Sequence, residues 1–131
     1  MNAKILVAED EPFIVESLTF LLSREGHEVM SVADGAEVIN SMHRNTPDLL
    51  ILDIMMPSCN GFDILQKIRL TPGLHETPVM ALTAKGQEAD RRRMLELGAN
   101  DFMTKPFSNT ELVTRIGDLL TARHVEYRKR N

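Results

Sequence analysis

Residues 49–57 read LLILDIMMP, and this stretch decides the fold. Four consecutive aliphatic residues without polar alternation are typical of a strand in a parallel sheet that is buried on both faces. Similar short runs recur along the chain, separated by helical patterns. The five expected strands cover residues 4–8, 28–32, 49–53, 79–82 and 101–104. Right-handed strand-helix-strand connections would place helices on both faces of one sheet, giving a three-layer α/β sandwich.

Five helices are expected between and after these strands. The first ends at Gly26 and the fourth at Gly98, because glycine is the usual C-terminal cap. Capping boxes at residues 34–37 and 108–111 open the second and fifth helices. The expected bounds are about 34–45 for the second helix and 87–97 for the fourth, while the third follows a turn at Asn60-Gly61 and ends near Leu70. The expected apolar stripes are Phe13, Ile14, Leu18, Leu21 and Leu22 in the first helix, and Leu112, Ile116, Leu119 and Leu120 in the fifth.

The fourth helix differs from the others because three arginines, residues 91–93, interrupt its apolar positions. Four of its residues remain to pack against the sheet: Ala89, Met94, Leu95 and Leu97. A helix with few buried apolar contacts is a candidate for movement. An ordinary edge helix with a solvated face fits the same pattern, and the sequence leaves both interpretations open.

The composition excludes several classes of protein. The chain has 131 residues, enough for one domain, and its 43% hydrophobic and 26% charged residues are ordinary for a globular protein. A net charge of −4 argues against a dedicated nucleic-acid binder, so we expect no direct contact with nucleic acid. There is neither an apolar run of roughly 20 residues nor a signal-peptide pattern, so we expect no membrane span. The single cysteine, Cys59, excludes an intrachain disulfide, and a reduced cytoplasmic location is expected.

Four of the five strands end in polar residues suited to a phosphoryl group. They are Glu9 and Asp10 after the first strand, Asp53 at the third, Thr83 after the fourth and Lys105 after the fifth. Because the C-terminal ends of parallel strands meet at one edge of a sheet, these side chains should converge there. Each has an ordinary structural explanation when taken alone, as a helix-start acidic pair, a cap or a surface charge. Their joint arrangement favours one shared site.

The chemistry of this set suits a divalent cation and a phosphoryl group. Three carboxylates at close range repel one another unless a cation neutralises them. All-oxygen ligation favours Mg²⁺ or Mn²⁺ over softer metals. A carboxylate oxygen of Asp53 could then attack phosphorus and form an acyl phosphate. Lys105 and the Thr83 hydroxyl suit the phosphoryl oxygens, and positioning with electrostatics supplies most of the catalysis in phosphoryl transfer.

From about residue 4 to residue 120 the chain resembles the receiver domains of two-component response regulators. The motifs that carry the resemblance are Glu9-Asp10, DIMMP at 53–57 with Gly61, Thr83-Ala84 and KPF at 105–107. The resemblance implies a flavodoxin-like fold with strand order 2-1-3-4-5 and five helices. It also implies that Asp53 receives its phosphoryl group from a sensor histidine kinase or a phosphotransfer protein.

The resemblance further implies a metal site. Asp10 and Asp53 would bind Mg²⁺ directly, the backbone carbonyl of Met55 would be a third ligand, and Glu9 would assist through water. Glu9 stands where the family commonly has aspartate, and its extra methylene could reach the metal or the lysine differently.

Other residues receive roles from the same resemblance. Lys105 would contact the phosphoryl group, its peptide bond to Pro106 would be cis, and the small Ala84 would leave the phosphorus accessible. Thr83 and Phe102 would form a switch that changes the surface of the fourth helix, fifth strand and fifth helix. Phe102 stands where tyrosine is frequent, and a plain core phenylalanine is the alternative interpretation. The same surface could form a homodimer.

Two other functions share parts of this pattern. Haloacid-dehalogenase-like hydrolases carry a second aspartate two residues after the nucleophile, where this chain has Met55. A flavodoxin-like cofactor binder needs glycines and hydroxyls in the first loop, where residues 9–12 read EDEP. We therefore expect no enzyme activity beyond the domain's own phosphorylation and dephosphorylation. The expected receiver covers 1–120, residues 121–131 form a charged helical extension or tail, and the chain is either stand-alone or cut from a longer regulator.

Overall fold

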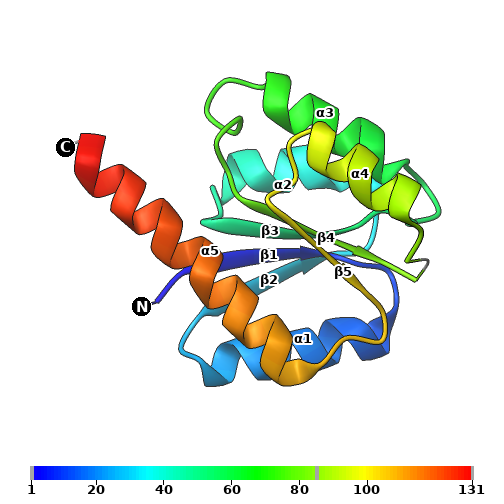
Figure 1. Ribbon diagram of the computed structural model, residues 1–131, viewed down its shortest axis with the longest axis horizontal. Helices are drawn as coiled ribbons and strands as arrows, with labels where there is room; N and C mark the ends of the chain where they lie inside the picture. The colour runs from blue at the N-terminus through cyan, green and yellow to red at the C-terminus, as the bar shows by residue number, and fades with distance from the viewer. Residues whose placement is uncertain (1, 85, 131) are drawn as a thin grey trace.

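The computed structural model describes the backbone of residues 2–84 and 86–130, and the side chains of these ranges up to residue 124. Five strands form one parallel sheet in the order β2-β1-β3-β4-β5, which confirms the expected topology (Figure 1). The strands are β1 Lys4–Ala8, β2 Glu28–Val32, β3 Leu49–Asp53, β4 Val79–Thr83 and β5 Asp101–Thr104. These bounds agree with the sequence prediction, except that β4 includes Thr83.

Helices cover both faces of this sheet. They are α1 Pro12–Arg24, α2 Val38–Arg44, α3 Gly61–Leu70, α4 Glu88–Glu96 and α5 Asn109–Arg130. Figure 1 shows α1 and α5 on one face and α2, α3 and α4 on the other, so the predicted three-layer sandwich is confirmed. Helix α5 continues well past the expected domain boundary at residue 120.

The burial of strand β3 on both faces explains why polar and apolar residues do not alternate in its sequence. All five of its residues are buried, and their side chains alternate between two separate cores. Leu50 and Leu52 pack in the core beneath α2, α3 and α4, whereas Leu49 and Ile51 pack in the core beneath α1 and α5. Fully burying one such side chain contributes about 1.5 to 3 kcal/mol, so this central strand demands apolar residues on both faces.

The helix starts depend on short polar side chains. Asn60 accepts a hydrogen bond from the Phe62 amide at 2.8 Å, and Ser108 accepts one from the Glu111 amide at 3.2 Å. Asp34 accepts from Ala36, but it opens a 3₁₀ turn over Gly35–Glu37 and not α2 itself. The prediction that residues 34–37 form the capping box of α2 is therefore wrong. Helix α2 begins after the 3₁₀ turn, and the side chain of its N-terminal cap residue, Glu37, makes no capping hydrogen bond.

Two residues expected to be buried in helices are exposed. Phe13 of α1 is 84% exposed and Ala89 of α4 is also exposed. Each lies five residues before a buried residue of its helix, Leu18 and Met94 respectively. Five residues correspond to a rotation of about 140° from the buried stripe at 3.6 residues per turn, so both side chains point away from the sheet.

Within the part of the chain that the structure describes, none of the helices combines the length and the apolar character that a bilayer span requires.

Two glycine substitutions should separate a packing constraint from helix propensity. A Cβ at Gly61 would lie 2.4 Å from the Ile54 Cα, whereas a Cβ at Gly117 in α5 would have no heavy atom within 4 Å apart from its chain neighbours and the backbone of its own helix. We expect Gly61→Ala to lower the free energy of unfolding by about 1 to 3 kcal/mol, because backbone must shift. Gly117→Ala should raise it by about 0.5 to 1 kcal/mol. Urea unfolding measures both, and a Gly61→Ala protein as stable as the parent would contradict the close approach.

Candidate functional site

The carboxyl edge of the sheet brings the predicted polar residues together. Glu9 directly follows β1, Asp53 ends β3, Thr83 ends β4 and Lys105 directly follows β5. The parallel register aligns these ends, pairing Asp53 with Leu82, and the Lys105 amide donates to the Thr83 carbonyl at 2.7 Å. Residues that are nearly a hundred positions apart in the chain therefore share one site.

Three carboxylates form the acidic part of this site. Oxygens of Glu9, Asp10 and Asp53 lie within 4.8 Å of one another, and both Glu9 and Asp53 are buried. Like charges this close are unfavourable in a poorly solvated environment. When ionised they carry three negative charges against the single positive charge of Lys105, which leaves an excess that one divalent cation would cancel. Carboxylate oxygens are also the donors that Mg²⁺ and Mn²⁺ prefer, so the residues present fit such an ion.

Lys105 is the only cation that the described ion pairs bring to these carboxylates. Its side chain is 9% exposed, and its Nζ contacts Glu9 Oε1, Asp53 Oδ2 at 3.2 Å and Glu11 Oε1 at 3.5 Å. Burial lowers the pKa of Lys105, but the carboxylates of Glu9 and Asp53 outweigh that effect and raise it. The ammonium group is therefore firmly charged. Its peptide bond to Pro106 is cis, as predicted.

Glu9 is the most buried carboxylate of the cluster. Its Oε2 accepts hydrogen bonds from the amides of Asp10 at 2.9 Å and Glu11 at 3.2 Å. Burial, together with the adjoining Asp53, raises the pKa of Glu9 to about 7, although Lys105 acts in the opposite direction. Without a bound cation, Glu9 therefore keeps its proton to a higher pH than an ordinary glutamate does.

Asp53 has its two oxygens in different surroundings. Oδ1 accepts a hydrogen bond from the Met55 amide at 2.9 Å, and Oδ2 faces Lys105. Met55 is 52% exposed, and the contact that it makes with Asp53 comes from its backbone amide. Ala84 is exposed, whereas the neighbouring Thr83 is buried.

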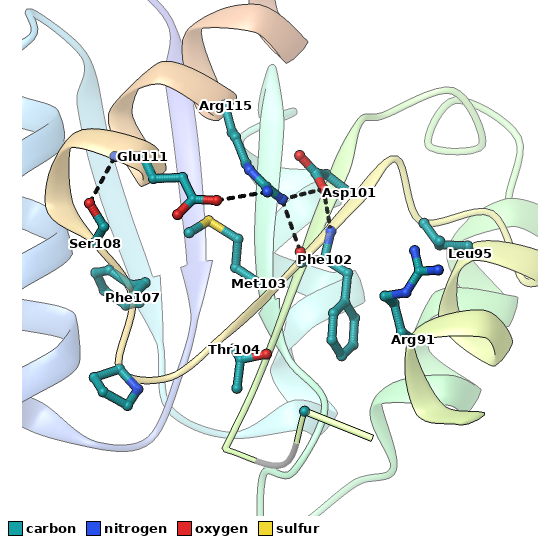
Figure 2. A pocket seen from close by; sticks show the side chains of 12 residues that line it. Arg91, Leu95, Asp101, Phe102, Met103, Thr104, Phe107, Ser108, Glu111 and Arg115 are labelled. Atoms are coloured by element: carbon teal, nitrogen blue, oxygen red, sulfur yellow. Dashed lines mark hydrogen bonds and ion pairs between the residues drawn. The ribbon is translucent and has the colours of Figure 1, made fainter. Parts of the chain in front are cut away.

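The two predicted switch residues lie in neighbouring strands. Thr83 is fully buried, and Phe102 is 8% exposed, packed in the core beneath α2, α3 and α4. Phe102 also lines a surface pocket of about 410 Å³ between α4, β5 and α5. Figure 2 shows its ring between β5 and two residues of α4, Arg91 and Leu95.

Sequence reasoning missed the polar network on the other side of this pocket. Arg115 of α5 donates to Asp101 Oδ1 at 3.0 Å, to the Phe102 carbonyl at 3.3 Å and to Glu111 Oε1 at 2.7 Å (Figure 2). Only the spacing of four residues between Glu111 and Arg115 signals any of it in the sequence. The Phe102 amide is also bonded to the Asp101 side chain, so both backbone groups of Phe102 on the open edge of β5 have side-chain partners. Such partners hinder pairing of an edge strand with another chain.

Comparison with known proteins identifies the family of the chain. Residues 5–117 match the family described as the response regulator receiver domain. The chain is 41% identical over 120 residues to the alkaline phosphatase synthesis transcriptional regulatory protein PhoP of Bacillus subtilis, covering 92% of this chain and 49% of that protein. It is 42% identical over 128 residues to the transcriptional regulatory protein CpxR of Escherichia coli K12, covering 98% and 53%. The chain thus spans about half the length of these relatives.

Comparison with solved structures also identifies receiver domains and response regulators. The signal receiver domain of a LuxO repressor protein from Vibrio parahaemolyticus superimposes with a TM-score of 0.92 at 25% identity, covering 100% of this chain and 99% of that one. A response regulator from Chloroflexus aurantiacus superimposes with a TM-score of 0.87 at 32% identity, covering 92% and 99%. Receiver domains of this family are signalling modules and not conventional enzymes. The chain belongs to the receiver domain family of two-component response regulators.

Proposed function

We propose that Asp53 accepts a phosphoryl group from a sensor histidine kinase or a phosphotransfer protein, and that the modification changes the surface of α4, β5 and α5. The observation that carries the proposal is the position of Asp53 Oδ2, which lies 3.2 Å from the Lys105 ammonium and inside a cluster of three carboxylates. A nucleophile, a cation and candidate metal ligands at one edge constitute a phosphoryl-transfer site.

The transfer itself requires little from the protein. An oxygen of Asp53 attacks the phosphorus of the donor's phosphohistidine; the new O–P bond forms as the N–P bond breaks, and the donor's imidazole keeps the electron pair. Lys105 is placed to hold a phosphoryl oxygen, and the Thr83 hydroxyl at the end of β4 is the neighbouring hydrogen-bond donor. Water later cleaves the acyl phosphate and restores the carboxylate, so the domain acts only on itself.

The metal part of the proposal assigns Mg²⁺, with Mn²⁺ as an alternative, to the acidic cluster. Asp10 and Asp53 would hold it with the Met55 carbonyl, and Glu9 would assist through a water molecule. The bound ion would neutralise the cluster and the incoming phosphoryl charge. Two observations support this assignment: carboxylate oxygens of Asp10 and Asp53 lie within 4.8 Å of each other, and the Met55 amide donates to Asp53 at 2.9 Å.

The output part concerns the pocket in Figure 2. Movement of the Thr83 hydroxyl towards a phosphoryl group would change the space beside β5, where the Phe102 ring packs. A shift of that ring would alter its contact with α4. A local change of charge that biases a bistable packing element is a general way for a site to reach a distant surface. Charges of both signs border the pocket, from Arg91 to Glu111, so a second copy of the chain is a suitable partner.

The proposal also covers the location of the receiver and its contact with nucleic acid. We infer a cytoplasmic location, and no direct contact of this domain with nucleic acid because its net charge is −4. The relatives are named transcriptional regulatory proteins and are about twice as long, so any DNA contact would lie in a further part of such a protein. The hydrolase and cofactor-binding alternatives have less support, since Met55 replaces the needed aspartate and acidic residues 9–11 occupy the first loop.

Phosphorylation should depend on Asp53. Incubation with acetyl phosphate and Mg²⁺ should add one phosphoryl group, seen by intact-mass spectrometry, and Asp53→Asn should abolish it because the amide is a poor nucleophile. Asp63→Asn removes an exposed carboxylate of α3 and should label like the parent. An equal adduct on Asp53→Asn would show that another residue is the acceptor.

Mg²⁺ should stabilise the folded protein through Asp10. At a concentration of ten times its dissociation constant, the ion raises the free energy of unfolding by about 1.4 kcal/mol, or roughly 3 to 6 °C in melting temperature. Asp10→Asn should lose most of this increase, yet be at least as stable as the parent without metal because repulsion in the cluster is relieved. Thermal unfolding with and without Mg²⁺ measures this. The same Mg²⁺ response in parent and variant would place the ligands elsewhere.

The charge state of Glu9 should make the metal-free protein less stable as pH rises. Its pKa is raised from 4.5 to about 7 by burial and by Asp53, so the folded state keeps a proton that the unfolded chain releases. This stabilisation is complete below about pH 4.5 and is lost as pH rises through about 7, at about 1.4 kcal/mol for each unit of pKa shift. Glu9→Gln should lack the effect.

The comparison needs urea unfolding of both proteins at pH 5 and pH 8 in the presence of a metal chelator. The free energy of unfolding of the parent minus that of Glu9→Gln should be larger at pH 5. Glu16→Gln, which changes an exposed residue of α1, should show the same difference from the parent at both values. A difference for Glu9→Gln that is independent of pH would mean that Glu9 titrates normally.

A further inference from the structure

Arg69, in the last turn of α3, binds the far end of α4 through an unusual set of acceptors. Its Nε and Nη2 both donate to the Gly98 carbonyl, at 3.0 and 2.7 Å, and Nη2 also reaches Asn100 Oδ1 at 3.0 Å. Its Nη1 donates to the carbonyls of His75 at 3.1 Å and Thr77 at 2.8 Å. These five hydrogen bonds end on four acceptors. All four are neutral oxygens, and they come from two separate connections of the chain.

The C-terminal end of α4 is shaped around this guanidinium group. Gly98 has φ of +106°, and a Cβ there would lie 2.8 Å from Arg69 Nε. The amides of Gly98 and Ala99 close the helix end by donating to the carbonyls of Leu95 and Met94, at 3.1 and 2.9 Å. A positive φ directly after a helix is a conformation that glycine adopts without strain. In this conformation the Gly98 carbonyl faces the Arg69 guanidinium group.

Two further contacts hold the same half of the helix. Met94 is fully buried in the core, and the Arg93 guanidinium lies 4.1 Å from the centroid of the Phe62 ring of α3. A cation at this distance from an aromatic face is attracted to it. Arg93 is therefore not simply a solvent-facing arginine, as its place in the triple-arginine run suggested.

The N-terminal half of α4 has no comparable attachment among the described residues. Gln87, at its N-terminal cap, makes no side-chain capping bond, and Glu88, Ala89 and Arg92 are exposed. The ion pair between Glu88 and Arg91, at 2.9 Å, lies within the helix and does not tie it to the rest of the protein. This half is also the one that follows Thr83 and the carboxyl edge of the sheet.

We propose that Arg69 fixes the C-terminal end of α4 as a pivot, so that α4 responds to the site by swinging its N-terminal end. The inference deepens the proposed function and rests on it for the stimulus. A phosphoryl group at Asp53 perturbs the chain near Thr83, where the helix is weakly held, while the guanidinium group holds the other end. The shift is then largest at Arg91 and smaller at Leu95, which line the same pocket (Figure 2).

Arg69 is a positioning residue because it lies away from the chemistry. Thr77 and Asn100 precede β4 and β5, so the guanidinium group sits at the amino edge of the sheet. Five-residue strands span about 16 Å between that edge and the carboxyl edge. Substitution of Arg69 should leave Mg²⁺ binding and labelling of Asp53 unchanged.

The first test uses the resting protein and does not depend on phosphorylation. Amide hydrogen exchange of residues 97–100 should be about tenfold faster in Arg69→Gln, because the helix end loses its partner. Exchange of residues 86–92 should change little. Lys67→Gln, which removes an exposed charge from the same helix turn, should match the parent. Arg69→Lys should lie between them, since an ammonium group keeps the charge but not the five-donor fork. Unchanged exchange at 97–100 in Arg69→Gln would overturn the pivot.

The second test compares each protein with and without beryllofluoride and Mg²⁺, a mimic of the phosphoryl group. In the parent, the exchange difference in α4 and the residues that flank it should fall on residues 86–92 and spare 97–100, whereas in Arg69→Gln it should spread to 97–100. Thr83→Ala should lose the difference in both backgrounds. An even difference across 86–100 in the parent would overturn the pivot. No difference in α4 of a protein that binds beryllofluoride would overturn the proposed output surface, while the resting comparison still decides whether Arg69 holds the helix end.

Discussion

The structure depends on one electrostatic constraint: a single ammonium group, that of Lys105, stands against buried carboxylates from two other parts of the chain. Glu9 and Asp53 would repel each other at this separation, and burial removes the water that would screen them. Lys105 offsets part of that repulsion, and a raised pKa of Glu9 removes another part. Such a cluster lowers the stability of the metal-free protein, and the proposed binding of a cation and a phosphoryl group would explain why it is kept.

Apolar burial in the parallel sheet stabilises the protein against this electrostatic repulsion. Apolar residues on both faces of β3 bury the strand completely, and that burial holds Asp53 at the end of a rigid element. Neighbouring strands then bring Thr83 and Lys105 alongside with their backbones joined by a hydrogen bond of 2.7 Å. Binding groups held by strand ends are positioned more precisely than groups on free loops.

The fold and the candidate site were largely predictable from the sequence, for a physical reason. Strands buried on both faces leave an unbroken aliphatic signal, and polar residues that end such strands must meet at one edge, so the cluster of Glu9, Asp10, Asp53 and Lys105 followed. The strand order came from family resemblance. The exposed positions of Phe13 and Ala89 were missed because apolar residues next to a stripe look like part of it. Bonds between Arg69 and distant backbone carbonyls leave no pattern in a sequence.

The unpredicted contacts change the interpretation of α4. Its sequence left open whether the helix is loosely packed or is an ordinary helix with a solvated face. In the structure, the two halves of the helix differ in how firmly the described residues attach them to the protein. The buried Met94 and the stacking of Arg93 on Phe62 anchor one half, whereas the other half is joined by residues 84–87 to the strand that ends in Thr83. When one end of a helix is fixed, a small displacement of the other end rotates the helix about the fixed end. Because Arg91 lies nearer the free end than Leu95, the pocket between α4 and β5 would open from the carboxyl edge, the same side on which charge is added.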